Sequence, residues 1–312
     1  MITFASVETA RQIIKNLYPE AKNVRFIEHG YDNLVGLVDN KYALKFPRNE
    51  YAYQRDQYEE QVLLDLESLD QLLIPRILGK GHNPPYFIAS FVPGKHLSAD
   101  EIRQLPTKQQ EDIAEKIARF AYAMHSLLPV DQAIEHRREL KLDSLKEQPW
   151  VTYFEESLEK MAFPNPQQDK LAKEYYKRWK SLQYSTPEVV VHDDLHNENL
   201  MFEGTNLIGV VDFGDTNIGH PEQEFRQMHR ISETILNLVI KNYEQLSNLK
   251  LNKEAIILWA ILQELAVYSE MLTSTKKDRP SFYRAARNLQ RWLPEGKWEV
   301  LVENTNEVSS KQ

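Results

Sequence analysis

The sequence predicts an α+β protein with two lobes, an N-terminal lobe built on an antiparallel sheet and a C-terminal lobe made mainly of helices. Short strand-like segments fill the first part of the chain, and apolar residues recur at helical spacing through most of the remainder. With 312 residues, the chain is longer than one ordinary domain. We place the N-lobe at residues 1–94 and the C-lobe at residues 95–312.

The N-lobe combines helices with short strands. Ser6 is a suitable N-cap for an amphipathic helix, and a second helix is expected over residues 52–69. Strands are predicted at residues 24–28, 34–38, 41–46, 74–78 and 86–91. Asp39 and Asn40 tolerate the backbone of a tight hairpin turn, and Gly94 helps to end the sheet.

The C-lobe shows the apolar spacing of amphipathic helices. This spacing is clearest at residues 113–128, 171–182, 231–246 and 254–272. The run of strands followed by a run of helices favours α+β organisation over an alternating α/β fold.

Composition excludes several kinds of site. The chain has no cysteine, so disulfides, thiolate metal sites and a cysteine nucleophile are excluded. A net charge of −8 argues against non-specific nucleic-acid binding. The N-terminus lacks a secretory pattern, and the apolar run at residues 255–262 is too short to span a bilayer, so we expect a cytoplasmic protein without a membrane partner.

The most informative segment is VVVHDDLHNENLMFEGTNLIGVVDFGD, residues 189–215. Two apolar strands flank a polar loop, which allows Asp194, Asn199 and Asp212 to converge at one sheet edge. Mg²⁺ takes oxygen ligands such as Asn199 and Asp212 and bridges triphosphate oxygens. Asp194 is then the candidate catalytic base that takes the proton of an acceptor hydroxyl.

The N-lobe supplies an independent test, because this chemistry pairs the loop with a lysine on the third strand and a glutamate on the next helix. Lys45 lies in the strand YALKF. Glu59 shares a helix face with apolar residues, whereas Glu60 lies on a more exposed face. We therefore predict that Lys45 pairs with Glu59 and positions the nucleotide phosphates.

Two backbone segments are predicted to bind the rest of the nucleotide. The turn that contains Gly30 and Asn33 allows the backbone to approach phosphate closely. Ser90 and Val92 lie in the link between the lobes, where backbone groups can bind a purine edge.

Together these residues resemble the aminoglycoside phosphotransferase family, which has a protein-kinase-like fold, and the resemblance covers most of the chain. It implies a small-molecule kinase that uses Mg²⁺ and transfers the γ-phosphoryl group of ATP or GTP to a hydroxyl. The Asp-Phe-Gly-Asp sequence that starts at Asp212 is similar to the aminoglycoside 2″-phosphotransferase branch. Ala89 is small at the position beside the purine, so we expect ATP as donor. Activity on aminoglycosides would also imply antibiotic resistance.

The chain departs from this family at three positions. Asp193 stands where Gly or Asn is common, Glu224 replaces an aspartate, and His220 replaces another acid. Unlike protein kinases, the chain continues from Gly214 to Pro221 without a long switch segment or an Ala-Pro-Glu sequence. We therefore expect an enzyme that is not switched by phosphorylation.

Acidic residues in the C-lobe are candidates for binding a cationic acceptor such as an aminoglycoside or amino-alcohol. Glu264 lies on an apolar helix face and needs a positive partner, which is either an internal arginine or an ammonium group of the substrate. Glu233 is a second candidate.

Two other functions remain open from the sequence. His192, Asp194 and His196 alternate as the ligands of a metal-dependent hydrolase might. A non-catalytic nucleotide-binding module would keep the fold without turnover. A metal-dependent hydrolase would leave Lys45 and Glu59 unexplained. We interpret His192 as a residue that organises the loop.

Overall fold

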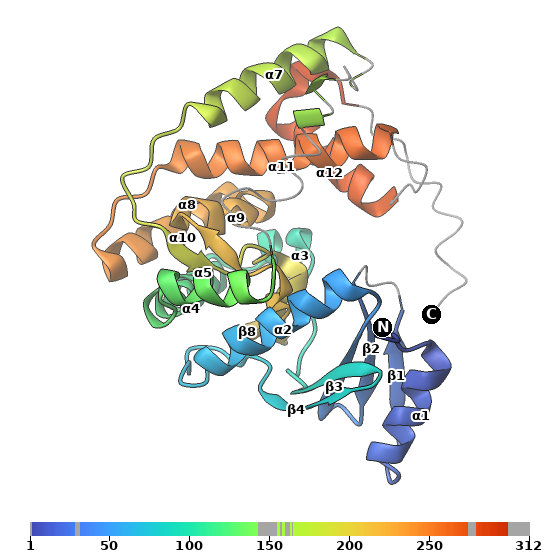
Figure 1. The fold of residues 1–312 in the computed structure, drawn as a ribbon. Coiled ribbons are helices and arrows are strands. Elements are labelled where there is room, and N and C mark those ends of the chain that lie inside the picture. Colours follow the sequence, from blue (N-terminus) through green and yellow to red (C-terminus); the bar gives the residue numbers. More distant parts are fainter. Residues whose placement is uncertain are drawn as a thin grey trace. The chain divides into compact units, whose positions relative to one another are not determined.

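The computed structural model describes residues 2–28, 32–142, 165–273 and 279–298, together with 155–156, 158–159 and 163. The chain divides into two compact units, one made of Met1–Lys146 and Tyr184–Lys253 and the other of Glu147–Gln183 and Glu254–Gln312. The first unit contains the sheet and the predicted catalytic residues, and the second is helical (Figure 1). The predicted lobe boundary at residue 94 stays a prediction.

The first unit contains a five-stranded antiparallel sheet with the strand order β1-β2-β3-β5-β4. Its strands are β1 (Val24–Ile27), β2 (Asn33–Val38), β3 (Tyr42–Pro47), β4 (Ile77–His82) and β5 (Pro85–Ser90). Asp39 and Asn40 both have a φ of 50°, the left-handed backbone that a tight turn between β2 and β3 requires. The predicted hairpin is therefore confirmed.

The position predicted for the fourth strand, residues 74–78, was wrong, because β4 begins at Ile77. The apolar segment before it runs beside β8 (Asn206–Val210) instead, where Leu73 N–H donates to Ile208 O at 2.9 Å and Leu73 O accepts from Val210 N–H at 2.8 Å. β4 is an edge strand whose residues alternate between partly buried and exposed, so its glycines and Lys80 gave no apolar signal.

Two helices contact the sheet. α1 (Val7–Leu17) begins at the predicted N-cap, where Ser6 Oγ accepts from Thr9 N–H at 3.1 Å. Ala10 and Ile14 of α1 are buried in one hydrophobic cluster with residues of β2 and β3. α2 (Glu50–Asp65) begins after Asn49, whose side chain accepts from Ala52 N–H at 2.9 Å.

The remainder of the first unit carries the predicted catalytic loop, residues 192–199, which contains Asp194. β6 (Val189–Val191) pairs with β9 (Asn217–Gly219), and β7 (Leu200–Glu203) pairs with β8. The helices are α3 (Ala99–Gln104), α4 (Thr107–Leu127), α5 (Val130–Glu139), α8 (Pro221–Glu224), α9 (Arg226–Ile231) and α10 (Glu233–Ser247). α4 packs against α10, as Figure 1 also shows.

The second unit is built on α7 (Pro166–Lys180), α11 (Lys253–Thr273) and α12 (Arg279–Trp292). Trp179 and Trp259 pack edge to face in its core, with ring centroids 5.0 Å apart. Within the described ranges, no helix is long and apolar enough to cross a membrane.

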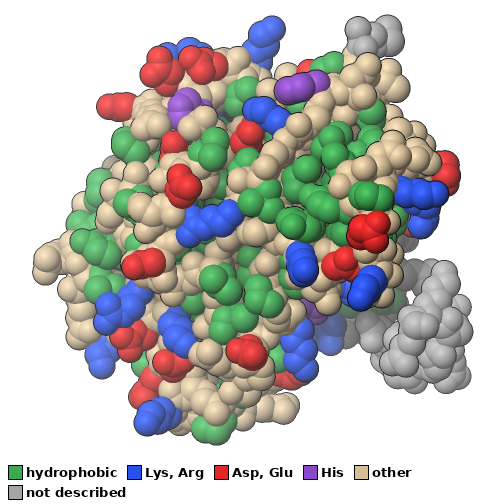
Figure 2. Space-filling view, turned by 90° about the horizontal axis from the view of Figure 1, so that it is seen from below, with side chains coloured by type: hydrophobic (Ala, Val, Ile, Leu, Met, Phe, Trp, Pro, Cys, Tyr) green, Lys and Arg blue, Asp and Glu red, His purple; other side chains and the backbone are tan. Residues whose placement is uncertain are grey.

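Charged side chains of both signs are interspersed with hydrophobic ones on the face shown in Figure 2. The net charge of −8 is therefore not concentrated in one region of that face.

Two glycines permit close backbone contacts around the hairpin of β7 and β8. Gly94 has a φ of 107°, and a Cβ there would lie 2.7 Å from Phe202 O. At Gly209 a Cβ would lie 2.5 Å from Val92 Cγ1 and 2.9 Å from Leu73 O. Both positions therefore require glycine for the observed packing.

Gly209→Ala should lower the free energy of unfolding by about 1–3 kcal/mol, because the added methyl group overpacks a contact with backbone. Urea unfolding of the full chain measures the change. Gly79→Ala is a matched control, since its Cβ would meet only Ile88 Cδ1 at 3.8 Å. Equal midpoints for both variants and the wild type would contradict the packing argument.

Candidate active site

His192 organises the loop that follows β6. Its side chain is fully buried, its Nε2 lies 3.2 Å from Val211 O, and its Nδ1 accepts the Asp194 N–H at 3.3 Å. Nδ1 thus bonds within the loop and Nε2, which carries the proton, bonds to the segment that follows β8. This agrees with the structural role predicted for His192.

The Asp194 carboxylate is held by one of its two oxygens. Oδ2 accepts from Asn199 Nδ2 at 3.1 Å and lies 3.2 Å from His196 Nε2. His196 Nδ1 accepts from Glu198 N–H, so its Nε2 carries the proton that faces Asp194. Within the described part of the chain, Oδ1 receives no hydrogen bond and is open to an acceptor hydroxyl.

The charge state of Asp194 suits a general base. Burial by itself raises the pKa of this carboxyl, but His196, together with His192 and Arg226, outweighs burial and holds the pKa below its ordinary value. Asp194 is therefore ionised at neutral pH. His196, whose role the sequence left ambiguous, orients the Asp194 carboxylate and stabilises its charge.

Asn199 and Asp212 offer oxygen atoms of the kind that Mg²⁺ prefers. The Asn199 amide nitrogen donates to Asp194 O at 2.9 Å, which leaves the amide oxygen for a metal. Val211 N–H donates to Asn199 O at 3.0 Å, and this bond places the adjacent Asp212 beside Asn199. The Asp212 side chain is 58% exposed and its φ is 66°. An amide oxygen and an exposed carboxylate fit a magnesium ion.

No group of three His, Asp or Glu side chains suited to a metal exists among the residues that the structure describes. His192 uses both ring nitrogens in hydrogen bonds to the backbone, so it is not available as a ligand. The geometry gives no support to a hydrolase metal site formed by His192, Asp194 and His196.

Lys45 forms the predicted ion pair with Glu59. Lys45 Nζ lies 2.6 and 2.8 Å from the two Glu59 oxygens and 3.5 Å from Asp212 Oδ1. Burial by itself lowers the pKa of Lys45, but the charges of Glu59 and Asp212 outweigh it and raise the pKa above its ordinary value. Glu60 pairs with Lys80 instead, at 2.9 Å.

The structure describes three of the four residues that were predicted to bind phosphate and purine. Gly30 lies outside the described residues. Asn33 Nδ2 donates to Asp56 Oδ1 at 2.8 Å, which ties the start of β2 to α2. Ser90 N–H donates to Arg76 O at 2.8 Å, which uses this donor within the protein.

Val92 follows β5, and its side chain is buried against Gly209. Among the described residues, no backbone hydrogen bond involves its N–H. The nucleotide-binding roles of Gly30, Asn33, Ser90 and Val92 stay predictions.

The two candidate acceptor residues already have protein partners. Glu264, in the second unit, is fully buried, accepts from Asn288 Nδ2 at 2.8 Å and lies 3.7 Å from Arg284 Nε. Arg284 is therefore the internal arginine that was one of the two predicted partners of Glu264. Glu233 begins α10, is 66% exposed and pairs with Lys253 at 2.6 Å. Their role toward an acceptor stays a prediction.

Sequence reasoning missed the partner of Asp193. This residue has a φ of 65° and is buried, and its carboxylate accepts from Arg226 and from Gln223 Nε2, the latter at 2.9 Å to each oxygen. Arg226 Nη2 also donates to the Asp193 carbonyl. Arg226 thus compensates the charge of Asp193 beneath the catalytic loop.

Glu224 fixes the same loop through its backbone. Its two oxygens accept from His192 N–H at 2.6 Å and from Asp193 N–H at 3.3 Å. Burial raises the pKa of Glu224, but the hydrogen bond and charge of His125 outweigh it and lower the pKa. The glutamate that departs from the family pattern is therefore an ionised anchor for the loop.

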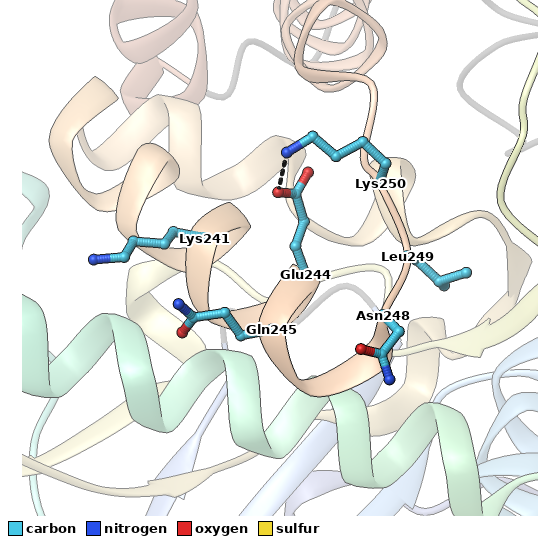
Figure 3. Close-up of a pocket in the computed structure, with 6 residues that line it drawn as sticks. All are labelled: Lys241, Glu244, Gln245, Asn248, Leu249 and Lys250. Carbon is cyan, nitrogen blue, oxygen red and sulfur yellow. Dashed lines mark hydrogen bonds and ion pairs between the residues drawn. The ribbon is translucent and has the colours of Figure 1, made fainter.

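A surface depression of about 380 Å³ lies over α10 and the residues after it (Figure 3). Glu244 pairs with Lys250 across it at 2.6 Å. Its lining contains none of the predicted site residues and consists of Lys241, Glu244, Gln245, Asn248, Leu249 and Lys250. We assign it no part in the chemistry.

Arg226→Met should lower the free energy of unfolding by about 3–5 kcal/mol, because it leaves the Asp193 carboxylate buried without its cation. Adding Asp193→Asn should restore part of that loss. Arg119→Met, at an exposed helix pair with Glu115, should change stability by less than about 1 kcal/mol. A loss at Arg226 no larger than at Arg119 would disprove the proposed compensation.

Solved structures resemble this fold. The GDP complex of the wild-type aminoglycoside 2'-phosphotransferase-IIIa has a TM-score of 0.75 and 18% identity, covering 92% of this chain and 98% of that one. The ADP-bound aminoglycoside phosphotransferase APH(2'')-Ib has a TM-score of 0.65 and 19% identity, covering 92% and 97%. The macrolide 2'-phosphotransferase MphH from Brachybacterium faecium has a TM-score of 0.62 and 13% identity, covering 88% and 98%.

These likenesses confirm the predicted kinase-like fold, with its antiparallel sheet and mainly helical remainder. No curated protein sequence matches this chain. The model of the phosphotransferase enzyme family matches residues 23–249, which include the sheet, the catalytic loop and the hairpin of β7 and β8. As the motifs predicted, the chain belongs to the phosphotransferase enzyme family.

Proposed function

We propose that this chain is a small-molecule kinase of the 2″-phosphotransferase branch, which transfers the γ-phosphoryl group of ATP or GTP to a hydroxyl of an aminoglycoside or related amino-alcohol. The observation that best supports this is the Asp194 carboxylate, ionised and open at Oδ1 while Oδ2 is held by Asn199 and His196. Lys45, Glu59 and Asp212 lie in the same compact unit.

Each of these residues has a separate role in the proposed reaction. An acceptor hydroxyl donates its hydrogen bond to Asp194 Oδ1 and loses its proton there as its oxygen attacks the γ-phosphorus. The bond from that phosphorus to the leaving diphosphate oxygen breaks in the same displacement. Lys45, held by Glu59, orients the phosphates. Mg²⁺ bound by Asn199 and Asp212 would neutralise charge on the triphosphate oxygens.

The identity of the acceptor is supported by ligands of similar structures, although at 13–19% identity those structures establish the fold alone. Similar aminoglycoside phosphotransferases were solved in a complex with GDP and kanamycin, in one with gentamicin, and in one with streptomycin and ATP. An adenine nucleotide and a guanine nucleotide thus both occur among these complexes. Ala89 of β5, a small residue opposite Ala43, favours adenine, so we propose ATP as donor and a cytoplasmic site of action.

A nucleotide-binding module without turnover is the second candidate. Against it stands the arrangement of Asp194, whose ionised and unoccupied oxygen serves a proton transfer and not nucleotide binding. Binding of nucleotide with no transfer to any acceptor would favour the module.

Asp194→Ala should lower kcat by about 10²–10⁴-fold because the proton acceptor is lost, while nucleotide affinity stays close to that of the wild type. Asp212→Ala should also weaken binding of the magnesium nucleotide. A coupled assay for nucleoside diphosphate with an aminoglycoside acceptor measures turnover, and calorimetry measures binding. Asp100→Ala is a control at a side chain that is 74% exposed. Wild-type rates in both site variants would overturn the assigned roles.

Expression of the chain in a susceptible bacterium should raise the inhibitory concentration of at least one aminoglycoside, because phosphorylation of a hydroxyl changes the drug. Cells expressing Asp194→Ala provide the control. Unchanged susceptibility, together with no turnover across an aminoglycoside panel, would reject aminoglycosides and leave other amino-alcohols to be tested as acceptors.

A further inference from the structure

Arg55 lies on α2, one helical turn before Glu59, and its guanidinium group joins three segments of the nucleotide site. Its Nε donates to Gly214 O at 3.1 Å. Its two terminal nitrogens donate to the carboxylates of Asp32 and Asp215. One side chain therefore connects the start of β2 and the Asp-Phe-Gly-Asp turn to the helix that bears Glu59.

The turn is packed between the metal ligand and the ion pair. A Cβ built on Gly214 would lie 3.6 Å from Asp212 Oδ1, 3.6 Å from Glu59 Oε2 and 3.7 Å from Arg55 Nη2. These are ordinary contact distances for an added methyl group, so the Gly214 backbone lies beside Asp212, Glu59 and Arg55 with room for a small side chain. A shift of Gly214 would also shift Asp212, which lies two residues earlier and 3.5 Å from Lys45.

The charges around Arg55 explain why an arginine is needed there. Asp32, Asp212 and Asp215 place three carboxylates beside the site proposed for a triphosphate. Burial raises the pKa of Asp215 to about 7, and Arg55 opposes that rise. Without Arg55, Asp215 would take up a proton, and Asp32, whose side chain is 34% exposed, would be left as an unpaired carboxylate that repels the nucleotide phosphates.

The guanidinium acts through these neighbours. Nε and both terminal nitrogens donate to protein oxygens, and the side chain is only 19% exposed. A lysine keeps the charge but lacks the planar set of donors that reaches three acceptors at once. Arg55 is therefore a positioning residue and not a ligand of the phosphates.

We propose that Arg55 holds the Asp-Phe-Gly-Asp turn against α2 and thereby sets the affinity of Asp212 and Lys45 for the magnesium nucleotide. This inference rests on the proposed function, because it assigns the site a magnesium nucleotide. It adds a residue that neither the catalytic motif nor the Lys45–Glu59 pair contains.

The test is calorimetric binding of Mg·ADP and Mg·ATP to the full chain. The acceptor substrate is left out, so that a contact between Asp215 and that substrate cannot affect the measured Kd. Arg55→Met should raise the Kd by at least about tenfold, and Arg55→Lys should fall between it and the wild type. Adding Asp32→Asn to Arg55→Met should lower the Kd again, because it removes the unpaired carboxylate. Stability alone would not predict such a recovery in binding.

Lys80→Met is the matched control, because Lys80 pairs with Glu60 on the same helix at 2.9 Å but contacts none of the turn. It should bind nucleotide like the wild type. If Arg55→Met does not fold, Asp215→Asn alone should still raise the Kd, since it removes one of the two contacts from Arg55 to the turn. Affinities within about twofold of the wild type for the foldable variants would overturn the inference. Failure of the wild type to bind either nucleotide would instead overturn the proposed function.

Discussion

The geometry of the catalytic loop depends on a buried carboxylate, that of Glu224. This side chain is fully buried and accepts the backbone N–H groups of His192 and Asp193, which no helix or strand partner satisfies. An unpaired buried N–H group lowers the free energy of unfolding by about 1–3 kcal/mol. The loop therefore adopts the conformation in which both N–H groups donate to the Glu224 carboxylate. The orientation of Asp194 follows from that conformation, since it is the next residue along the chain.

The fold and the chemistry of the site were largely predictable because their signals are local in the sequence. The spacing from Asp194 to Asn199 and Asp212 fits within one segment, and helix periodicity was enough to prefer Glu59 over Glu60 as the partner of Lys45. The fourth strand was misplaced for a physical reason. An apolar segment can be buried against a sheet or beside another strand, and composition does not distinguish the two.

The partners of the buried and clustered charges could not be predicted. Arg226 and Asp193 are 33 residues apart, and Arg55 and Asp215 are 160 residues apart. An arginine on a short helix gives the same sequence signal whether it lies in solvent or beneath a loop. Only the three-dimensional structure shows that the charge of Asp193, which lies next to Asp194 in the chain, is compensated by Arg226.

The segments around the β7–β8 hairpin also bear on how nucleotide enters and leaves. Leu73 is hydrogen-bonded to β8, and Lys95 exchanges backbone hydrogen bonds with Phe202 of β7, at 3.0 and 2.8 Å. The chain leading to β4 and the chain leaving β5 are therefore both attached to the same hairpin. Rotation of the sheet about a single hinge peptide would break bonds at one attachment or the other. The sheet and the hairpin should thus move as one body when a nucleotide enters or leaves.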